Sequence, residues 1–325
     1  MNIAHSSNTI LVTGGSGLVG SAIQSIISDY SNYKFIFLSS LDINLLNYEK
    51  VYEYFMNIKP RYIIHLAANV GGLFKNIEYP VEMLDENLKI NSNVLKAAYY
   101  CGSVLKLVAC LSTCIFPDLK EENFKPITET DLHLGPPHSS NAAYAYAKRI
   151  LQVQCDSYNK EYGCNFVCVI PTNIYGPNDN FNLQNSHVIP GLIHKAYLAN
   201  KNGSKFIISG TGKPLRQFIH SEDFAKCIMW FLLDLPKNLK INTIILSPDP
   251  NSEISIGYIG ELIAKEFDLE NNLEYDITKS DGQFKKTASN NLFRMHNPSY
   301  KFIDIETGIK TTVDWFKKNY DIVRK

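Results

Sequence analysis

Tyr144 and Lys148 are spaced for joint chemistry on one helix. They lie four residues apart in a predicted helix, residues 143–162, so both side chains project from the same face. A lysine ammonium lowers the pKa of a nearby phenol, which favours Tyr144 as a proton donor. Ser112 follows a predicted strand, residues 106–111, where its hydroxyl can bond a carbonyl oxygen. In isolation such a pair is more often a packing tyrosine beside a solvated lysine, so the remaining sequence must decide.

A glycine-rich turn opens the first predicted helix. Gly14, Gly17 and Gly20 lie between a predicted strand, residues 9–12, and a predicted helix, residues 19–27. Glycine permits a tight bend, brings backbone amides close to a pyrophosphate and packs the helix against the strand. This position predicts a dinucleotide site. Its expected lining residues are Gly14, Ser16, Gly17, Leu18, Val19 and Gly20.

The end of the second predicted strand, residues 35–38, indicates which dinucleotide binds. NAD sites usually place a carboxylate there for the ribose 2′-hydroxyl, whereas this strand is followed by Ser39 and Ser40. The absence of a carboxylate favours NADP, bound as NADPH or NADP+. Asp42 lies close by, and it either caps the turn or contacts the adenine side.

The third predicted strand, residues 62–66, ends in a stretch where a cofactor can lie flat: Leu66, Ala67 and Ala68. His65 in the same strand is interpreted as a hydrogen-bonded structural histidine. The other residues expected at the cofactor are Lys148, Pro171, Asn173, Ile174 and His187.

These residues need a scaffold, and the first half of the chain predicts one of alternating strands and helices. Such alternation implies parallel pairing with right-handed crossovers. The expected fold class is therefore α/β, with a Rossmann-type doubly wound parallel sheet. Predicted strands are residues 9–12, 35–38, 62–66, 106–111 and 166–170, and predicted helices are residues 19–27, 48–57, 86–100 and 143–162.

The second half is less regular and predicts a smaller, mixed α/β domain. We expect an NADP-binding domain over residues 1–176 and a mainly substrate-binding domain over residues 177–325, with some segments returning to the first. Ligands of such sheets bind at the carboxyl ends of the strands, which predicts a cleft between the two parts. Helices are expected at residues 188–200, 223–235, 256–267 and 309–320, and strands at residues 205–209 and 243–246.

Composition excludes several classes of protein. Basic and acidic residues both number 32, so no net charge attracts nucleic acid or an anionic membrane. The polar start and the lack of a long apolar run predict neither a signal peptide nor a membrane helix, hence a cytoplasmic protein. An odd cysteine count without a CxxC pair argues for reduced thiols and against a metal site. The seven cysteines are Cys101, Cys110, Cys114, Cys155, Cys164, Cys168 and Cys227.

The glycine turn, Ser112, Tyr144 and Lys148 together resemble the extended short-chain dehydrogenases/reductases. Longer strings resemble the branch of that family that epimerises and then reduces a GDP-linked 4-keto-6-deoxy sugar, and they cover the chain from end to end. These strings are LVTGGSGLVGSAI, HLAANVGGLFKN, LSTCIFP, GPPHSSNAAYAYAKR, IPTNIYGPNDNFN, HVIPGLIHKAYLA, GTGKPLRQFIHSEDFA and TKSDGQFKKTASN.

The resemblance implies an acid–base pair, Cys114 and His187, that inverts C3 and C5 of GDP-4-keto-6-deoxy-D-mannose. Hydrogens on both carbons are weakly acidic because the C4 ketone flanks them, and their exchange needs a base, an acid and donors to the enolate oxygen. Without the motifs, the two residues would be interpreted as a buried thiol and a loop histidine. A free thiol has a pKa near 8.5, so Cys114 is expected to need modest lowering by its surroundings.

The diphosphate of a GDP-sugar needs basic partners. Lys195, Arg216 and Lys286 lie in the matching strings, as does Asp281, and these four are the expected substrate-binding residues. Lys195 departs from the arginine of some bacterial relatives. The family resemblance also implies a homodimer formed through two helices per subunit, here residues 86–100 and 143–162.

Two alternatives stay open. One is another nucleotide-sugar reductase or epimerase, although Cys114 and Ile115 after Thr113 argue against a dehydratase, which carries an acid there. The other is a non-catalytic NADP-binding protein. It predicts the loss of at least one catalytic group, whereas all five are present: Ser112, Cys114, Tyr144, Lys148 and His187.

Overall fold

The computed structural model describes residues 8–118, 125–236, 239–281 and 283–325. Its centre is a six-stranded sheet with the order β2–β1–β3–β4–β5–β10, in which every neighbouring pair is parallel. This confirms the predicted α/β, Rossmann-type fold class. The strands are β1 (Thr9–Thr13), β2 (Lys34–Leu38), β3 (Tyr62–His65), β4 (Lys106–Cys110), β5 (Phe166–Pro171) and β10 (Thr243–Leu246).

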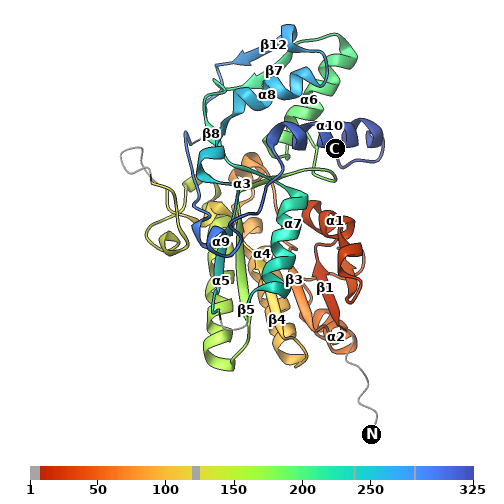
Figure 1. Cartoon of the computed structure of the whole chain (residues 1–325), viewed down its shortest axis with the longest axis vertical. Coiled ribbons are helices and arrows are strands. Elements are labelled where there is room, and N and C mark those ends of the chain that lie inside the picture. The colour runs from red at the N-terminus through yellow and green to blue at the C-terminus, as the bar shows by residue number, and fades with distance from the viewer. Residues whose placement is uncertain (1–7, 119–124, 237–238, 282) are drawn as a thin grey trace.

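Helices cover both faces of the sheet (Figure 1). Because side chains of a strand alternate between faces, Leu11 of β1 packs in one core, whereas Ile10 and Val12 pack in the other. Both faces are thus apolar, which explains why the strands are continuous apolar runs. The first core includes residues from α2 (Tyr48–Ile58), α4 (Pro80–Tyr100) and α5 (Ala142–Tyr162), and the second from α1 (Leu18–Ser25) and α7 (Ser221–Met229).

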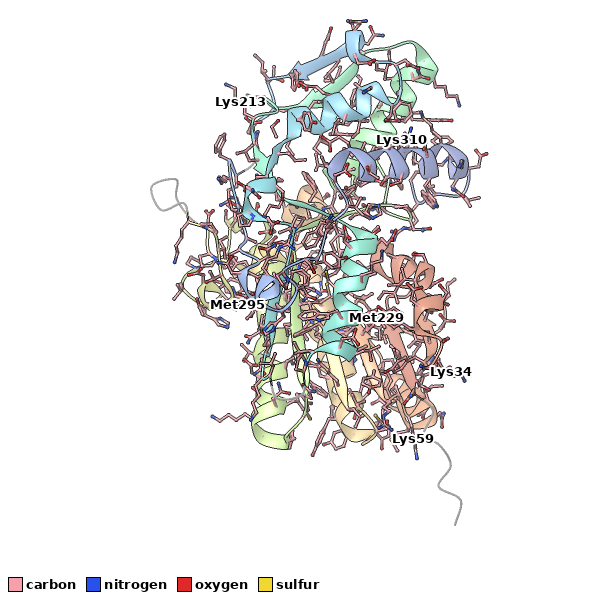
Figure 2. All side chains as sticks on the ribbon, in the orientation of Figure 1. Lys34, Lys59, Lys213, Met229, Met295 and Lys310 are labelled. Atoms are coloured by element: carbon pink, nitrogen blue, oxygen red, sulfur yellow. The ribbon has the colours of Figure 1, made fainter. Side chains whose placement is uncertain are left out.

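Two helices differ most from their predicted bounds. The helix expected from residue 86 begins at Pro80, which is tolerated at the first position of a helix because that N–H has no intrahelical acceptor. The helix expected over residues 223–235 is α7, which ends at Met229 and continues as a π-helical turn, Trp230–Asp234. Met229 itself is fully buried (Figure 2).

A smaller part of the molecule lies beyond the carboxyl ends of the strands (Figure 1). Its own core is built around Phe181, Phe206 and Phe316. It contains α6 (Val188–Asn202), α8 (Ile256–Lys265), α10 (Ile305–Asn319) and the parallel pair β7 (Phe206–Ser209) and β12 (Leu273–Asp276). Two further pairs are β6 (Asn173–Tyr175) with β9 (Phe218–His220) and β8 (Leu215–Arg216) with β11 (Ile254–Ser255), and short helices are α3 (Leu73–Glu78) and α9 (Asn291–His296).

The chain returns to the sheet after entering the smaller part. Strand β10 pairs with β5 along the register Thr243–Cys168 to Leu246–Pro171, and α7 packs beside α1 (Figure 1). The sequence predicts that some segments return to the first domain, but it does not identify them. Among the described residues, no helix is long and apolar enough to cross a membrane.

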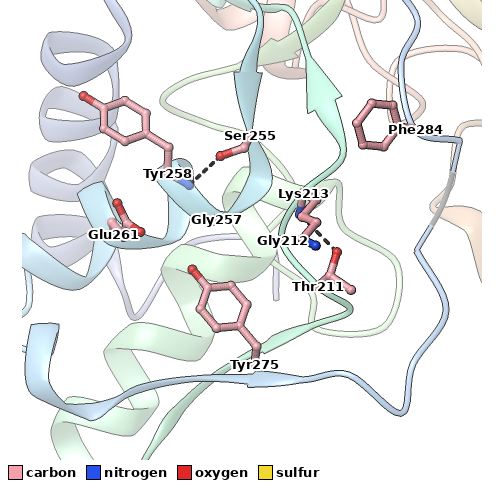
Figure 3. A pocket seen from close by; sticks show the side chains of 9 residues that line it. All are labelled: Thr211, Gly212, Lys213, Ser255, Gly257, Tyr258, Glu261, Tyr275 and Phe284. Carbon is pink, nitrogen blue, oxygen red and sulfur yellow. Dashed lines mark hydrogen bonds between the residues drawn. The ribbon is translucent and has the colours of Figure 1, made fainter.

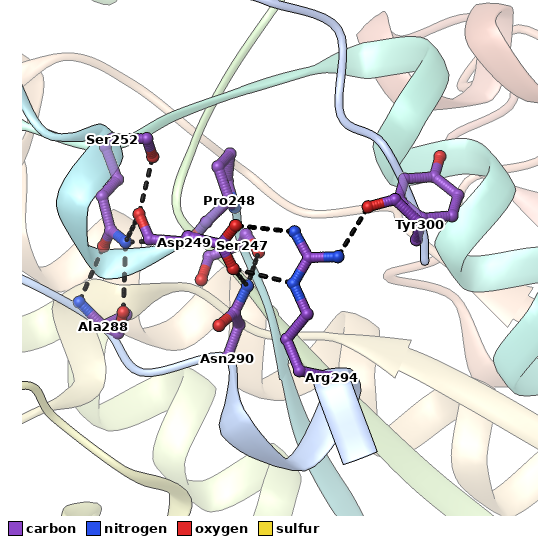
Figure 4. A network of polar contacts seen from close by, with 9 residues as sticks. Ser247, Pro248, Asp249, Ser252, Ala288, Asn290, Arg294 and Tyr300 are labelled. Carbon is purple, nitrogen blue, oxygen red and sulfur yellow. Dashed lines mark hydrogen bonds and ion pairs between the residues drawn. The ribbon is translucent and has the colours of Figure 1, made fainter. Parts of the chain in front are cut away.

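A polar network fastens the chain after β10 to the segment that follows residue 286 (Figure 4). The side chain of Gln217 donates to the carbonyls of Pro248 and Ala288 and accepts from the Ala288 amide. Asp249 accepts two hydrogen bonds of 2.7 Å from the Arg294 guanidinium. The network fixes two segments that carry expected substrate-binding residues. Gln217 follows Arg216, and Ala288 lies shortly after Lys286.

We expect Arg294→Met to lower the free energy of unfolding by about 1 kcal/mol, a modest value because Asp249 is partly open to solvent. Hydrogen bonds from Arg294 hold the pKa of Asp249 below its ordinary value. The stabilisation is therefore present above the unfolded-state pKa of about 4 and is lost as pH falls through the folded-state pKa. Urea unfolding at neutral and acidic pH measures it.

Lys226→Met, which removes an exposed ion pair with Glu222 on α7, is the control and should cost less. An Arg294→Met penalty that stayed constant into strong acid would contradict the assignment to Asp249.

Candidate active site

The glycine turn forms a tight cradle between β1 and α1. Gly14 has a φ of 72°, and a Cβ on Gly20 would lie 2.4 Å from the Gly15 carbonyl oxygen. The Gly15 amide donates to the Leu38 carbonyl at 2.7 Å, tying the turn to the end of β2. No acidic residue lies in the first turn of α1, so its amides and positive dipole end suit an anion.

At the end of β2, Asp42 caps the turn. Its carboxylate accepts from the Ser39 amide at 2.8 Å and from the Ser39 hydroxyl at 2.6 Å, and these bonds lower the pKa of Asp42. The first of the two alternatives left by the sequence, the cap, is therefore observed, and a contact of Asp42 with the adenine side stays a prediction. The Ser39 hydroxyl hydrogen is therefore engaged by Asp42, while Ser40 is exposed beside it.

His65 is a hydrogen-bonded structural histidine, as predicted. Its Nε2–H donates to Asn91 Oδ1 at 3.1 Å, and its Nδ1 accepts from the Thr13 hydroxyl at 2.8 Å. Burial lowers the pKa of His65 to about 3, with the nearby charge of Lys148 acting in the same direction. Thr13 also accepts from the Ala67 amide, so a neutral imidazole locks the ends of β1 and β3, where the strand order reverses and ligands of such sheets bind.

Tyr144 and Lys148 project from the same face of α5, as predicted, with the Lys148 ammonium 5.8 Å from the Tyr144 ring centroid. Lys148 is buried and donates to the Cys110 carbonyl at 2.8 Å. The expected lowering of the phenol pKa is wrong for this structure. Burial raises the pKa of Tyr144 well above its ordinary value, because desolvation of a phenolate outweighs the influence of a lysine that a carbonyl already holds. Tyr144 therefore remains protonated.

Cys114 lies in a helical turn, Thr113–Ile115, directly after β4. The Ser112 hydroxyl oxygen accepts from the Cys114 amide at 3.3 Å. Beneath the turn, Arg149 is buried and donates from Nε to the Ile115 carbonyl at 2.5 Å. Arg149 was not among the predicted site residues, although it directly follows Lys148 on α5.

The electrostatic surroundings of Cys114 differ from expectation. Burial raises the pKa of the thiol, while the hydrogen bond with Ser112 and the charges of Lys286 and Lys148 lower it. Burial is the largest of these influences, so the expected net lowering is wrong and the thiol is the resting form. Burial lowers the pKa of Lys286, and Cys114 raises it. Lys286 and Cys114 are thus neighbours, although they stand far apart in sequence.

His187 begins α6 as its N-cap residue. The side chain is exposed to solvent, yet protein surrounds it closely enough that desolvation lowers the pKa of the imidazole. The neutral form therefore predominates at neutral pH. No hydrogen bond or ion pair within the described residues joins His187 to Cys114 or Tyr144.

The expected substrate-binding residues fall into different surroundings. Arg216 donates to the Leu215 and Phe284 carbonyls, and its charge is one of the influences that lower the pKa of Lys286, after burial. Asp281 is occupied by protein, since it accepts from the Thr211 amide at 2.9 Å and from its hydroxyl at 2.6 Å.

Lys195 lies on α6. It lines a recess of about 230 Å³ on α6, together with Ser209. Lys285, which precedes Lys286 in sequence, forms an ion pair with Glu253 at 2.9 Å. The two adjacent lysines therefore have different partners.

The segment after β5 is held to β9. Asn173 donates from its backbone and side-chain nitrogens to the Gln217 carbonyl, so its side-chain oxygen and second amide hydrogen are left for a ligand. Pro171 is buried and Ile174 is half-buried. Thr172 between them is buried, and its hydroxyl has no hydrogen-bond partner.

A second recess, of about 590 Å³, is lined in part by Thr211 and Phe284, the hydrogen-bond partners of Asp281 and Arg216 (Figure 3). Figure 3 shows Lys213, Tyr258 and Tyr275 on its walls, at the start of α8 and the edge of β12. None of the five expected catalytic residues lines it. The candidate site is therefore identified by its reactive side chains and not by the size of a cavity.

The fold and this site define an NAD(P)-type epimerase, dehydratase or reductase scaffold. A model of the NAD dependent epimerase/dehydratase family matches residues 10–245, and the chain belongs to this family.

Individual relatives narrow the similarity. The chain is 49% identical over 327 residues to GDP-L-fucose synthase of Dictyostelium discoideum, with all of both chains covered. It is 44% identical to the probable GDP-L-fucose synthase of Drosophila melanogaster, over 97% of this chain and 99% of that one. A GDP-L-fucose synthetase from Naegleria fowleri, solved bound to NADP, matches with a TM-score of 0.91 and 43% identity over 99% of this chain and 96% of the other. The resemblance stated from the motifs is confirmed.

Proposed function

We propose that the protein inverts C3 and C5 of GDP-4-keto-6-deoxy-D-mannose and then reduces C4 with NADPH, giving GDP-L-fucose. The observation that carries this proposal is the packing of the turn Thr113–Ile115, which holds Cys114 and follows Ser112, against α5, which holds Tyr144. A simple ketone reductase needs only the hydroxyl donors, whereas a thiol beside them suits proton exchange next to the ketone. Relatives that share the full chain length bear the name of this activity.

The chain's residues fit NADPH. A Cβ at Gly20 would fill the cradle between β1 and α1, and the acid-free start of α1 suits a pyrophosphate. Ser40 at the exposed end of β2 borders the ribose 2′-phosphate, while Asp42 is turned back onto Ser39. When bound, NADPH supplies the hydride for C4. The proposed division is a cofactor part up to residue 176 and a substrate part after it, apart from α7 and β10.

In the epimerisation, the thiolate of Cys114 removes the proton from C3 or C5, and the imidazolium of His187, a minor form at neutral pH, returns one from the opposite face. Negative charge moves onto the C4 oxygen as each C–H bond breaks, and the Ser112 and Tyr144 hydroxyls donate to it. Because burial favours the thiol, the reactive thiolate is a minor form, supported by the charges of Lys148 and Lys286.

In the reduction, the same two hydroxyls hold the C4 oxygen. Tyr144 gives its proton to that oxygen as it becomes an alkoxide, which suits a phenol that stays protonated through neutral pH. Lys148, fixed by the Cys110 carbonyl, supplies positive charge beside Tyr144.

We propose that Arg216 and Lys286 bind the diphosphate, because they are neighbouring cations at the edge of the Cys114 turn. Lys195 lies on α6 beside a recess of its own, and we assign it to the nucleoside end of the substrate. Asp281 then acts on the substrate through Thr211, whose loop it holds.

The test is NADPH consumption with GDP-4-keto-6-deoxy-D-mannose, with the product identified by NMR. Oxidation that yields GDP-L-fucose is the expected result. Binding of NADPH without its consumption would direct attention to other keto-sugar nucleotides. Failure to bind NADPH would overturn the assignment of the cofactor.

We also propose a homodimer through α4 and α5. Tyr146, Ile150 and Val153 share one face of α5 and are 42%, 39% and 48% exposed, an apolar stripe that a second copy can cover. Val153→Glu should convert the dimer to monomer in sedimentation experiments. A wild-type protein that sediments as a monomer would contradict this.

A further inference from the structure

The loop that leads to His187, residues 177–187, is fastened to a segment far along the chain, residues 320–325. The Phe181 amide donates to the Arg324 carbonyl at 2.8 Å, and the Arg324 guanidinium donates to the Asn178 carbonyl at 2.9 Å. Asn178 has a φ of 67°, a conformation that non-glycine residues adopt at some cost and that surrounding contacts must hold. Arg324 thus joins the loop at two points.

Phe181 anchors the same loop in the smaller core. Its ring is fully buried, and its centroid lies 4.5 Å from that of Phe316 and 6.1 Å from that of Trp315 on α10. The carbonyl of Phe181 accepts from His194 Nδ1 on α6 at 2.7 Å. The start of the loop is therefore rigid on both sides of residue 181.

A compact turn, residues 182–186, connects the anchored residue Phe181 to His187. The side-chain oxygen of Asn182 accepts from the amides of Gln184 and Asn185 at 2.9 and 3.0 Å, and its carbonyl accepts from the Ser186 amide at 2.9 Å. The Asn185 carbonyl in turn accepts from the Gly72 amide. His187 follows directly, so the direction of its side chain depends on where Asn182 is held.

Arg324 also balances a buried charge in this loop. Asp179 is 5% exposed; one carboxylate oxygen accepts from the Asn180 amide, while the other has no hydrogen-bond partner. Burial raises the pKa of Asp179 to about 7, and Arg324 is the cation that opposes this. Loss of Arg324 would leave an uncompensated buried group beside the strained residue 178.

We propose that Arg324 is a positioning residue for the epimerisation: by holding residues 178–181 it sets the position of the His187 imidazole. This rests on the proposed function, in which His187 is the acid. Reduction is separable, because Tyr144 and Lys148 lie on α5 and Ser112 precedes the turn Thr113–Ile115. Within the part of the chain that the structure describes, the hydrogen bonds of Arg324 go to Asn178 and Phe181 and to neither of these elements.

The test compares Arg324→Gln with Lys325→Gln, which removes an exposed hydrogen bond to the Tyr320 carbonyl and a cation–π contact with the Tyr320 ring. We expect Arg324→Gln to slow deuterium uptake at C3 and C5 about tenfold or more, since small misplacements of a catalytic group cost up to about 10²-fold. NADPH affinity should be unchanged in both variants. Arg324→Lys, which keeps the charge, should recover part of the rate.

A second measurement needs no substrate. The imidazole NMR signals of His187, assigned by their absence in His187→Gln, should broaden or shift in Arg324→Gln and stay unchanged in Lys325→Gln. Unaltered signals together with wild-type deuterium uptake would overturn the proposal. Absence of uptake by the wild-type protein, with altered His187 signals in Arg324→Gln, would reject the proposed function while leaving the positioning of His187 intact.

Discussion

Cys114→Ser is expected to reduce deuterium uptake at C3 and C5 of the keto-sugar by about 10²- to 10⁴-fold, the range lost with a catalytic base. A serine hydroxyl is far less acidic than a thiol, so it yields almost no anion at neutral pH, while its size preserves the turn Thr113–Ile115. NADPH affinity should not change. Uptake followed by NMR in D₂O and binding followed by fluorescence measure the two properties separately.

The same variant has a pH signature. Burial raises the pKa of Cys114 and lowers that of His187, and uptake needs the thiolate of one together with the imidazolium of the other. Between the two pKa values the thiolate fraction rises about tenfold per pH unit while the imidazolium fraction falls about tenfold, so wild-type uptake should stay level there and fall below the pKa of His187. Cys114→Ser should stay low across this range. Cys164→Ser, which alters a half-buried thiol at the far end of α5, should keep the wild-type profile. Equal loss of NADPH binding and uptake in Cys114→Ser would remove the assignment of Cys114 as the base.

Tyr144→Phe is expected to lower the rate of NADPH oxidation by about 10²- to 10⁴-fold. The change keeps the ring packed on α5 and removes only the proton that the C4 oxygen needs. Deuterium uptake should fall less, because Ser112 still donates to the enolate oxygen. Stopped-flow absorbance of NADPH under single-turnover conditions measures the chemical step itself.

Tyr146→Phe is the matched control, since Tyr146 lies on the same helix and is exposed. It should oxidise NADPH as the wild type does. A Tyr144→Phe protein with a near-normal rate would exclude this residue as the proton donor.

Local sequence patterns predicted most of the fold. The first five strands are apolar on both faces, and their predicted positions agree with the structure to within one or two residues. The partner of β10 was not readable in this way, because an apolar run records burial and not the neighbour it pairs with. Strand β12 was missed for a related reason: Glu274, Tyr275 and Asp276 are half-exposed or exposed residues with little apolar pattern.

The candidate site was predictable where spacing determines geometry. Tyr144 and Lys148 share a helix face, and His65 is bonded at both nitrogens. The pKa directions of Tyr144 and Cys114 were wrong, because they depend on how much protein surrounds each group, which no spacing reveals. Arg324 was missed since its partner Asn178 stands 146 positions earlier in the chain.

The return of the chain to the sheet has a consequence for folding. Strand β5 pairs with β4 on one side but receives its second neighbour, β10, only from residues 243–246. During synthesis the chain must therefore hold an open apolar strand edge until about three-quarters of it has been made, and such edges invite pairing with other molecules. A fragment that ends at residue 176 should consequently aggregate, and completion of the sheet should be a late, slow step set by contacts distant in sequence.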